Sequence, residues 1–211
     1  MSGLKLSAIS WLALIALSWL TACGSAATPV TPTATVITSV VPTLAARWKH
    51  FAGNGVSLSL PDTYTDYVKV IKAEGGPQAT LAEAAQSNPD MYRLWLVDST
   101  TLTSDPPVHV LISVLPGTNE PMDLKALLDS YARSASKQAQ LGPAEKVVIG
   151  PHSGLRALID VPEAGLTQVV CILQAGNRIY SVIYTAATDR LQDVLPVFEQ
   201  SIQTFTPSPS P

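Results

Sequence analysis

Apolar and polar residues alternate along most of the chain. Residues 48–51 and 56–60 show a two-residue period on either side of the Gly-Asn-Gly segment at 53–55, which predicts a β-hairpin. Five more apolar or alternating runs predict further strands, at residues 91–98, 108–115, 155–161, 168–173 and 178–184. Residues 62–67, which include Tyr64 and Tyr67, are expected to form a loop.

Three other segments have helical periodicity. Residues 80–86 predict a short helix, with Thr80 as its N-cap and Glu83 three residues later. The strongest helical pattern starts from a cap at Asp123 or Asn119 and should end at the Gly-Pro pair of residues 142–143. Its apolar face consists of Leu124, Leu127, Leu128, Tyr131 and Ala135.

The last helical pattern extends from about Asp189 to Ile202. Pro196 lies inside it and removes a backbone donor, so we expect a kink there or a new start near Asp193. Together, strands joined by short turns and well-separated amphipathic helices predict an α+β domain. We expect a twisted antiparallel or mixed central sheet of about six to seven strands, flanked by two or three helices.

The amino-terminal residues have the layout of a secretory signal. Lys5 precedes residues 6–20, which are apolar and uncharged. This run is shorter than the roughly 20 apolar residues of a membrane-spanning helix. An uncleaved anchor helix and an ordinary export signal are the alternatives.

Residues Leu20, Thr21, Ala22 and Cys23 resemble the lipobox of bacterial lipoproteins. The resemblance implies that residues 1–22 are a signal peptide and that Cys23 becomes the first residue of the mature chain, with a diacylglycerol on its sulfur. Two or more acyl chains hold a protein firmly to a bilayer. The expected location is the cell membrane, lipid-anchored on its extracytoplasmic side.

Composition divides the remaining chain into three parts. Residues 23–46 contain the lipidated cysteine and a Thr- and Pro-rich segment, which predicts an extended tether. Residues 47–206 contain all the predicted strands and helices and form one domain. Residues 207–211 are Pro and Ser, and we expect a disordered tail.

Both ends of the domain resemble the PsbP, Mog1 and DcrB-like group of α+β domains. The residues that carry the resemblance are Phe51, those at 55–61 and 179–184, and Phe198, Ser201, Ile202 and Phe205. Tyr64 stands where many members have a Trp. The resemblance implies a twisted antiparallel sheet between helices, in proteins that serve as binding or assembly factors.

Charge and cysteine content narrow the function further. Charged residues make up 14% of the chain and the formal net charge is −3, with no basic cluster, so we expect no nucleic-acid partner. The second of the 2 cysteines, Cys171, has no disulfide partner if Cys23 is lipidated. Because Cys171 lies in an apolar run, it should pack as a small buried hydrophobe.

Residues with catalytic or metal-binding chemistry are scattered. His50, His109 and His152 lack the close spacing of zinc ligands, and Asp62 with Asp66 would hold a hard cation only loosely. Ser153 precedes Gly154 but lacks the first glycine of a nucleophile elbow. We therefore predict no catalytic, metal-binding or cofactor-binding residues, and no cofactor.

The sequence thus predicts a non-catalytic binding or assembly domain, held at the membrane through Cys23, with a protein or a small ligand as its partner. One alternative is an envelope carrier of a small molecule or metal ion, with an apolar pocket. The other is a hydrolase that uses Ser153 and a histidine.

Overall fold

The computed structural model describes residues 47–74, 79–89, 92–115 and 122–207. The signal peptide, Cys23 and the tether lie outside these residues, as do residues 208–211 and the alternative cap Asn119. The predictions for these residues stay predictions. The short helix predicted at residues 80–86 is present and spans Ala79–Ser87, so Thr80 lies inside the helix and is not its N-cap.

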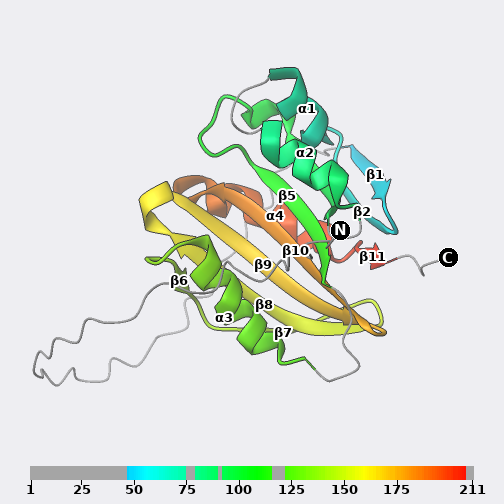
Figure 1. The fold of residues 1–211 in the computed structure, drawn as a ribbon, viewed down its shortest axis with the longest axis vertical. Coiled ribbons are helices and arrows are strands. Elements are labelled where there is room, and N and C mark those ends of the chain that lie inside the picture. Colours follow the sequence, from blue (N-terminus) through cyan, green and yellow to red (C-terminus); the bar gives the residue numbers. More distant parts are fainter. Residues whose placement is uncertain (1–46, 75–78, 90–91, 116–121, 208–211) are drawn as a thin grey trace, which may run out of the picture. The chain divides into compact units, whose positions relative to one another are not determined.

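The main sheet has eight strands, in the order β3-β4-β5-β10-β9-β8-β6, with β7 also paired to β8 (Figure 1). Each described pair in it is antiparallel. The strands are β3 (Tyr64–Asp66), β4 (Tyr92–Asp98), β5 (His109–Leu115), β6 (Gln140–Leu141), β7 (Glu145–Ile149), β8 (His152–Val161), β9 (Leu166–Ala175) and β10 (Arg178–Ala187). The short strands β3, β6 and β7 were not predicted.

The predicted hairpin forms β1 (Trp48–Gly53) and β2 (Val56–Pro61), which belong to a separate sheet with β11 (Thr206–Pro207). Asn54 and Gly55 have φ values of 46° and 77°, as a tight hairpin turn requires. On the other side of β2, Thr206 pairs with Ser57. Pro207, assigned from the sequence to the tail, is thus the last residue of a strand.

Four α-helices are described: α1 (Tyr67–Glu74), α2 (Ala79–Ser87), α3 (Leu124–Ala135) and α4 (Leu191–Ile202). Asp123 caps α3 as predicted, because its Oδ1 accepts hydrogen bonds from the backbone N–H groups of Lys125 and Ala126. The helix ends at Ala135, well before Gly142, because Ser136 adopts an extended backbone and Gln140 already pairs with Asp160 of β8.

Helix α1 replaces the loop that the sequence predicts. Tyr64 lies in β3, and Tyr67 begins α1. Asp66 holds the start of the helix, because its Oδ1 accepts from the Lys69 N–H at 3.3 Å. Tyr67 and Ile71 pack against Val97 of β4, so tertiary packing fixes a segment whose valines and isoleucine have only modest helix propensity.

Helix α4 begins at Leu191, after a single 3₁₀ turn at Thr188–Arg190, and continues through Pro196. The predicted new start near Asp193 is therefore wrong. Proline at this position removes one backbone donor, while the buried side chains of Leu191, Phe198 and Ile202 hold the helix on the sheet. No helix among the described residues is long and apolar enough to cross a membrane.

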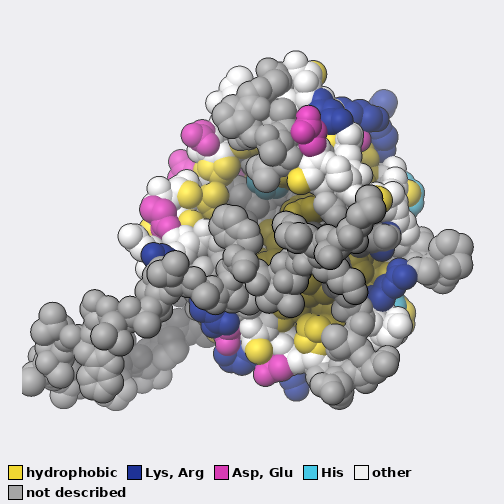
Figure 2. Space-filling model, in the orientation of Figure 1, with side chains coloured by type: hydrophobic (Ala, Val, Ile, Leu, Met, Phe, Trp, Pro, Cys, Tyr) yellow, Lys and Arg dark blue, Asp and Glu magenta, His cyan; other side chains and the backbone are white. Residues whose placement is uncertain are grey.

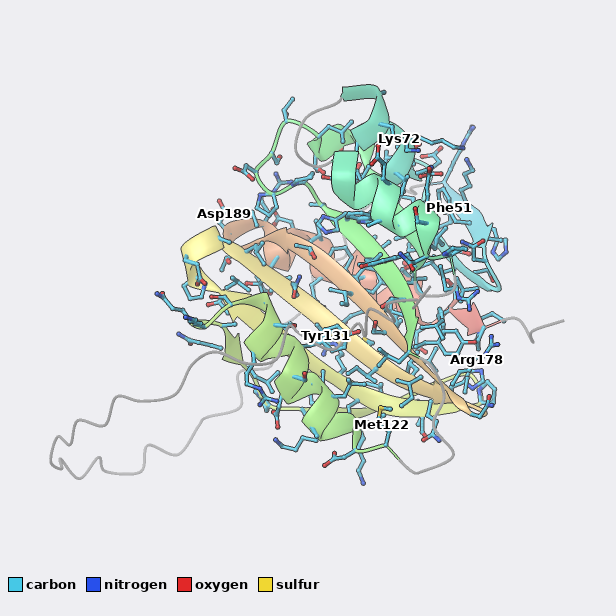
Figure 3. The ribbon with its side chains drawn as sticks, viewed as in Figure 1. Phe51, Lys72, Met122, Tyr131, Arg178 and Asp189 are labelled. Atoms are coloured by element: carbon cyan, nitrogen blue, oxygen red, sulfur yellow. The ribbon has the colours of Figure 1, made fainter. Side chains whose placement is uncertain are left out.

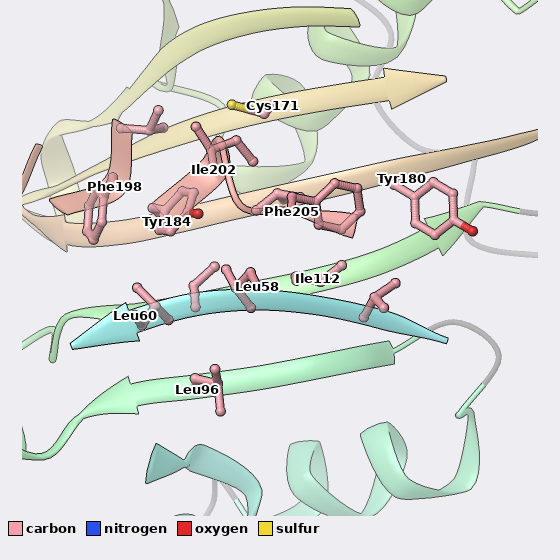
Figure 4. Close-up of a cluster of buried hydrophobic side chains, with 14 of the residues drawn as sticks. Leu58, Leu60, Leu96, Ile112, Cys171, Tyr180, Tyr184, Phe198, Ile202 and Phe205 are labelled. Atoms are coloured by element: carbon pink, nitrogen blue, oxygen red, sulfur yellow. The ribbon is translucent and has the colours of Figure 1, made fainter. Parts of the chain in front are cut away.

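Apolar clusters fill both faces of the main sheet. On one face, α4 and β2 cover β4, β5, β9 and β10 (Figure 4), with the rings of Tyr184 and Phe198 stacked at 4.5 Å. On the other face, α3 covers β8, β9 and β10 with the fully buried Leu128. Tyr131 reaches from α3 toward β10 (Figure 3), where its hydroxyl donates to Ser181 Oγ at 2.9 Å. The predicted α+β class with an antiparallel central sheet is confirmed.

Candidate functional site

A cavity of about 400 Å³ opens beside the tip of the β1–β2 hairpin. We call it the hairpin pocket, and it brings together the hairpin turn, the β3–α1 junction, the end of α2 and the first half of β4. Its lining residues are Ala52, Gly53, Asn54, Asp66, Val68, Ala85, Gln86, Pro89, Tyr92, Arg93, Leu94 and Trp95. Its size falls within the range of small-molecule sites.

The hairpin tip is fixed to β4. Arg93 Nη1 donates to the Asn54 carbonyl oxygen at 3.0 Å, and Asn54 Nδ2 donates to the Tyr92 carbonyl oxygen at 3.4 Å. The backbones also approach closely at Gly53, where an added Cβ would lie 3.2 Å from the Arg93 carbonyl oxygen. These contacts hold the two walls of the hairpin pocket at a set separation.

Two of the side chains that line the pocket, Asp66 and Gln86, are engaged by lysines of α1. Asp66 Oδ2 lies 3.7 Å from Lys69 Nζ, and its Oδ1 caps the helix. Gln86 Oε1 accepts a hydrogen bond from Lys72 Nζ. Both lysines are exposed, and Figure 2 shows basic side chains gathered over α1.

Trp95 forms part of the inner wall of the hairpin pocket. Its indole Nε1 is buried and has no hydrogen-bond acceptor within the described part of the chain. The ring packs edge-on against Tyr67, with the centroids 5.1 Å apart. A buried donor that the protein does not pair is rare, because leaving it unsatisfied is costly.

Behind the pocket, His109 packs into the same aromatic cluster. Its ring centroid lies 5.5 Å from that of Tyr67 and 6.2 Å from that of Trp95. Nδ1 donates to the Pro107 carbonyl oxygen at 3.0 Å, and burial lowers the pKa of the imidazole. His109 therefore acts as a neutral packing residue with one fixed tautomer.

The structure does not bring together the residues of the hydrolase alternative. Ser153 lies on β8, opposite Val148 and Gln174, and is exposed. No hydrogen bond joins it to a histidine within the described residues, and His50 is exposed on β1. His152 directly precedes Ser153 in the strand, so the two side chains point to opposite faces.

Cys171 is buried in β9, as predicted, opposite Arg156 of β8. Burial raises the pKa of its thiol to about 12. It borders a second cavity of about 180 Å³, also lined by Arg156, Glu199, Ile202 and Gln203. A thiol that stays protonated at physiological pH is a poor nucleophile.

The two acidic residues considered for a cation have separate roles. Asp66 caps α1, whereas Asp62 is exposed and its backbone N–H donates to the Arg47 carbonyl oxygen. Among the described residues, no group of three or more His, Cys, Asp or Glu side chains is placed to hold a metal ion.

The hairpin pocket was not predicted from the sequence. Its residues come from four separated segments and form no motif. One signal was present, because Arg93 interrupts the apolar pattern of β4 beside Tyr92 and Trp95. A polar residue within an otherwise apolar strand can indicate a site.

The sequence matches no protein-family model, and no curated protein matches it. Solved structures align with this chain at low sequence identity. Cyanobacterial PsbP from Synechocystis has a TM-score of 0.49 and 10% identity, over 81% of this chain and 98% of that one. A Pseudomonas aeruginosa protein of unknown function has a TM-score of 0.41 and 17% identity, over 49% of this chain and 74% of that one.

A protein from Bacteroides thetaiotaomicron has a TM-score of 0.43 and 14% identity, over 77% of this chain and 49% of that one. This chain therefore spans about half the length of that protein. Similarity at this level does not indicate a shared activity.

Proposed function

We propose that this chain is a membrane-anchored lipoprotein on the extracytoplasmic side, whose α+β domain binds a partner without catalysing a reaction. The anchor is supported by the sequence around Cys23. Lys5, the uncharged residues 6–20 and the small residues before Cys23 follow one another in the order of a lipoprotein signal. The Thr- and Pro-rich segment that follows supplies a tether.

A non-catalytic role is supported by the state of the candidate reactive groups. The Cys171 thiol is held protonated by burial, and His109 is held in an aromatic cluster by its hydrogen bond to Pro107. Ser153 lies within a regular strand instead of on a sharp strand-to-helix turn. Each group therefore has a structural explanation.

The binding role is carried by one observation, the convergence of four chain segments around the hairpin pocket. The Arg93–Asn54 and Asn54–Tyr92 hydrogen bonds fix its walls. A preformed cavity lined by apolar side chains and a few polar groups is the usual form of a ligand site.

Substitution of the proposed anchor residue tests the location. The Cys23→Ser variant, expressed in a bacterium that processes lipoproteins, should lose its acyl chains and leave the washed membrane fraction or keep its signal peptide. Mass spectrometry of the purified chain reports both changes. The matched control is Cys171→Ser, which should remain acylated and in the membrane fraction; a Cys23→Ser chain that is still processed and retained would contradict the proposal.

The non-catalytic role has a separate test. A fluorophosphonate probe, which labels serines activated by a neighbouring base, should leave the chain unlabelled. Labelling that disappears in Ser153→Ala would instead support the hydrolase alternative.

A further inference from the structure

We propose that two copies of this chain pair through β7, with the two strands antiparallel and a two-fold axis at Val147. The pairing joins the two main sheets edge to edge. It goes beyond the proposed function and does not depend on the hairpin pocket. Three features of β7 carry it, namely its unpaired backbone, its exposed apolar surface and the symmetric placement of its outward-facing residues.

Strand β7 forms an edge of the main sheet. It pairs with β8 and with no other strand of the described part. A two-residue turn at residues 150–151 joins β7 to β8, so Ile149 and His152 are a hydrogen-bonded pair. Hydrogen-bonded and non-hydrogen-bonded pairs alternate along an antiparallel ladder, and the backbone groups of Lys146 and Val148 therefore point away from β8. Within the described residues these outward N–H and C=O groups have no partner.

The same edge carries apolar surface. Val148 is 69% exposed, against 37% for Leu158, the other exposed large apolar side chain of the described part. On the opposite face of β7, Val147 and Ile149 pack with the main core and border the cavity of about 180 Å³. Residues 145–149 contain no proline, which is one of the devices that block an edge strand. Such an edge is a template for a further strand.

The outward-facing residues favour a second copy of β7 as that strand. Lys146 and Val148 flank Val147 on either side. Antiparallel pairing about a two-fold axis at Val147 therefore places each Lys146 opposite the partner's Val148. Residues in such a pair exchange both of their backbone hydrogen bonds, so every outward group of both strands gains a partner. A self-complementary contact of this kind is the isologous interface of a C2 dimer.

Other registers of the same two strands are less favourable. A register with Lys146 opposite the partner's Lys146 brings like charges together. A register with Val148 opposite the partner's Val148 runs into the turn at Gly150, whose φ of 56° is not that of a strand. In the register centred on Val147, the aliphatic stem of each Lys146 lies over the partner's Val148 while its ammonium group stays in water.

The contact is small, because β7 contributes 5 residues from each chain. Stable dimers bury roughly 1,200–2,000 Å² in total, and one pair of short strands buries less. We therefore expect a weak dimer whose population depends on concentration. Anchoring on one membrane surface, as proposed above, would raise the effective concentration of the chains.

Disulfide trapping tests the register. Residues in a non-hydrogen-bonded pair have Cα atoms about 4.5 Å apart, which a disulfide spans. The Val147→Cys chain, full-length, purified in mild detergent and treated with oxidised glutathione, should therefore form a covalent dimer on non-reducing gels. Mass spectrometry should identify the link as one between the two introduced cysteines.

Glu145→Cys is the matched control, because it lies on the same face of the same strand. In this register Glu145 is opposite the partner's Ile149, so the two introduced cysteines are roughly 13 Å apart along the strands and should stay unlinked. No link in Val147→Cys, or an equal link in Glu145→Cys, would overturn the proposal.

Val148→Pro tests the backbone hydrogen bonds. The proline removes an N–H that points away from β8, so the ladder between β7 and β8 keeps its hydrogen bonds, whereas pairing with a second copy loses donors. Combined with Val147→Cys, it should abolish the covalent dimer. Val148→Thr keeps the N–H and the branched side chain and should retain the dimer, and thermal unfolding followed by circular dichroism checks that both variants are folded. An undiminished dimer in Val148→Pro would overturn the pairing through β7.

Discussion

The Arg156 guanidinium of β8 lies 2.9 Å from the Glu199 carboxylate of α4. Its other terminal nitrogen lies 3.5 Å from Glu145 of β7. The arginine is 22% exposed, and the two carboxylates are 56% and 63% exposed. One partly shielded cation on β8 therefore links the neighbouring strand β7 and the covering helix α4.

We expect Arg156→Met to lower the free energy of unfolding by about 1 kcal/mol, since methionine keeps apolar packing but loses both ion pairs. Urea denaturation followed by circular dichroism measures the change. Lys125→Met removes the more exposed pair with Asp129 and should cost about 0.5 kcal/mol or less. Equal losses in the two variants would show that Arg156 contributes no more than an ordinary surface pair.

Gly154 should tolerate no side chain. An added Cβ would lie 2.0 Å from the Ile172 carbonyl oxygen of the neighbouring strand, so Gly154→Ala must force β8 and β9 apart. We expect a loss of about 3 kcal/mol or more, at the upper end of overpacking effects. Gly142→Ala is the control, because there the closest contact is an ordinary 3.4 Å; thermal unfolding compares the two.

The Cys171 thiol should be unreactive in the folded chain. Its pKa is raised to about 12 by burial, and thiolate is the reactive form. In the Cys23→Ser background Cys171 is the remaining thiol, so iodoacetamide at pH 8 should modify it in urea but not in native buffer. Native modification at the rate of a free thiol would contradict the burial of this side chain.

The same shift predicts how stability changes at high pH. The unfolded thiol ionises near its ordinary pKa of about 8.5, whereas the folded thiol stays protonated up to a pKa of about 12. Ionisation therefore favours the unfolded chain between these values, and stability should fall as pH rises through them. In the Cys171→Ala variant, the free energy of unfolding, measured by urea denaturation at a series of pH values, should lack this part of the decline.

Because His109 is buried, we expect the stability of the fold to fall as the pH is lowered. Burial lowers its pKa in the folded chain, so the unfolded chain takes up a proton first as pH falls below about 6.5. The stability present above that value should therefore decline toward the folded-state pKa. The free energy of unfolding, measured by urea denaturation, should therefore change less between pH 7 and pH 5 in the His109→Gln variant than in the wild type. The control variant His152→Gln should show the wild-type dependence on pH.

The sequence correctly predicted those elements that a few neighbouring residues specify. The hairpin follows from Asn54 and Gly55, which adopt the positive φ that its turn needs, and α3 follows from the cap Asp123. Helix α1 was missed, because its stability comes from the contact of Ile71 with Val97 of another element. The short strand β7 likewise depends on pairing with β8.

The candidate site could not be predicted in the same way. The hairpin pocket exists because Asn54, Gln86 and Trp95 meet from three distant segments, and only the tertiary fold sets their separation. The burial of Cys171 was predicted correctly, since an apolar run on both sides of a residue indicates a core strand.

Strand β1 lies between the point where the chain enters the domain and the hairpin pocket. The chain enters the domain at Trp48, and the hairpin pocket begins at Ala52 and Gly53 at the far end of the same strand. A six-residue strand measures about 17 Å from first to last residue. Force transmitted through the chain to Trp48 would therefore enter β1 at the end of the strand opposite the mouth of the hairpin pocket.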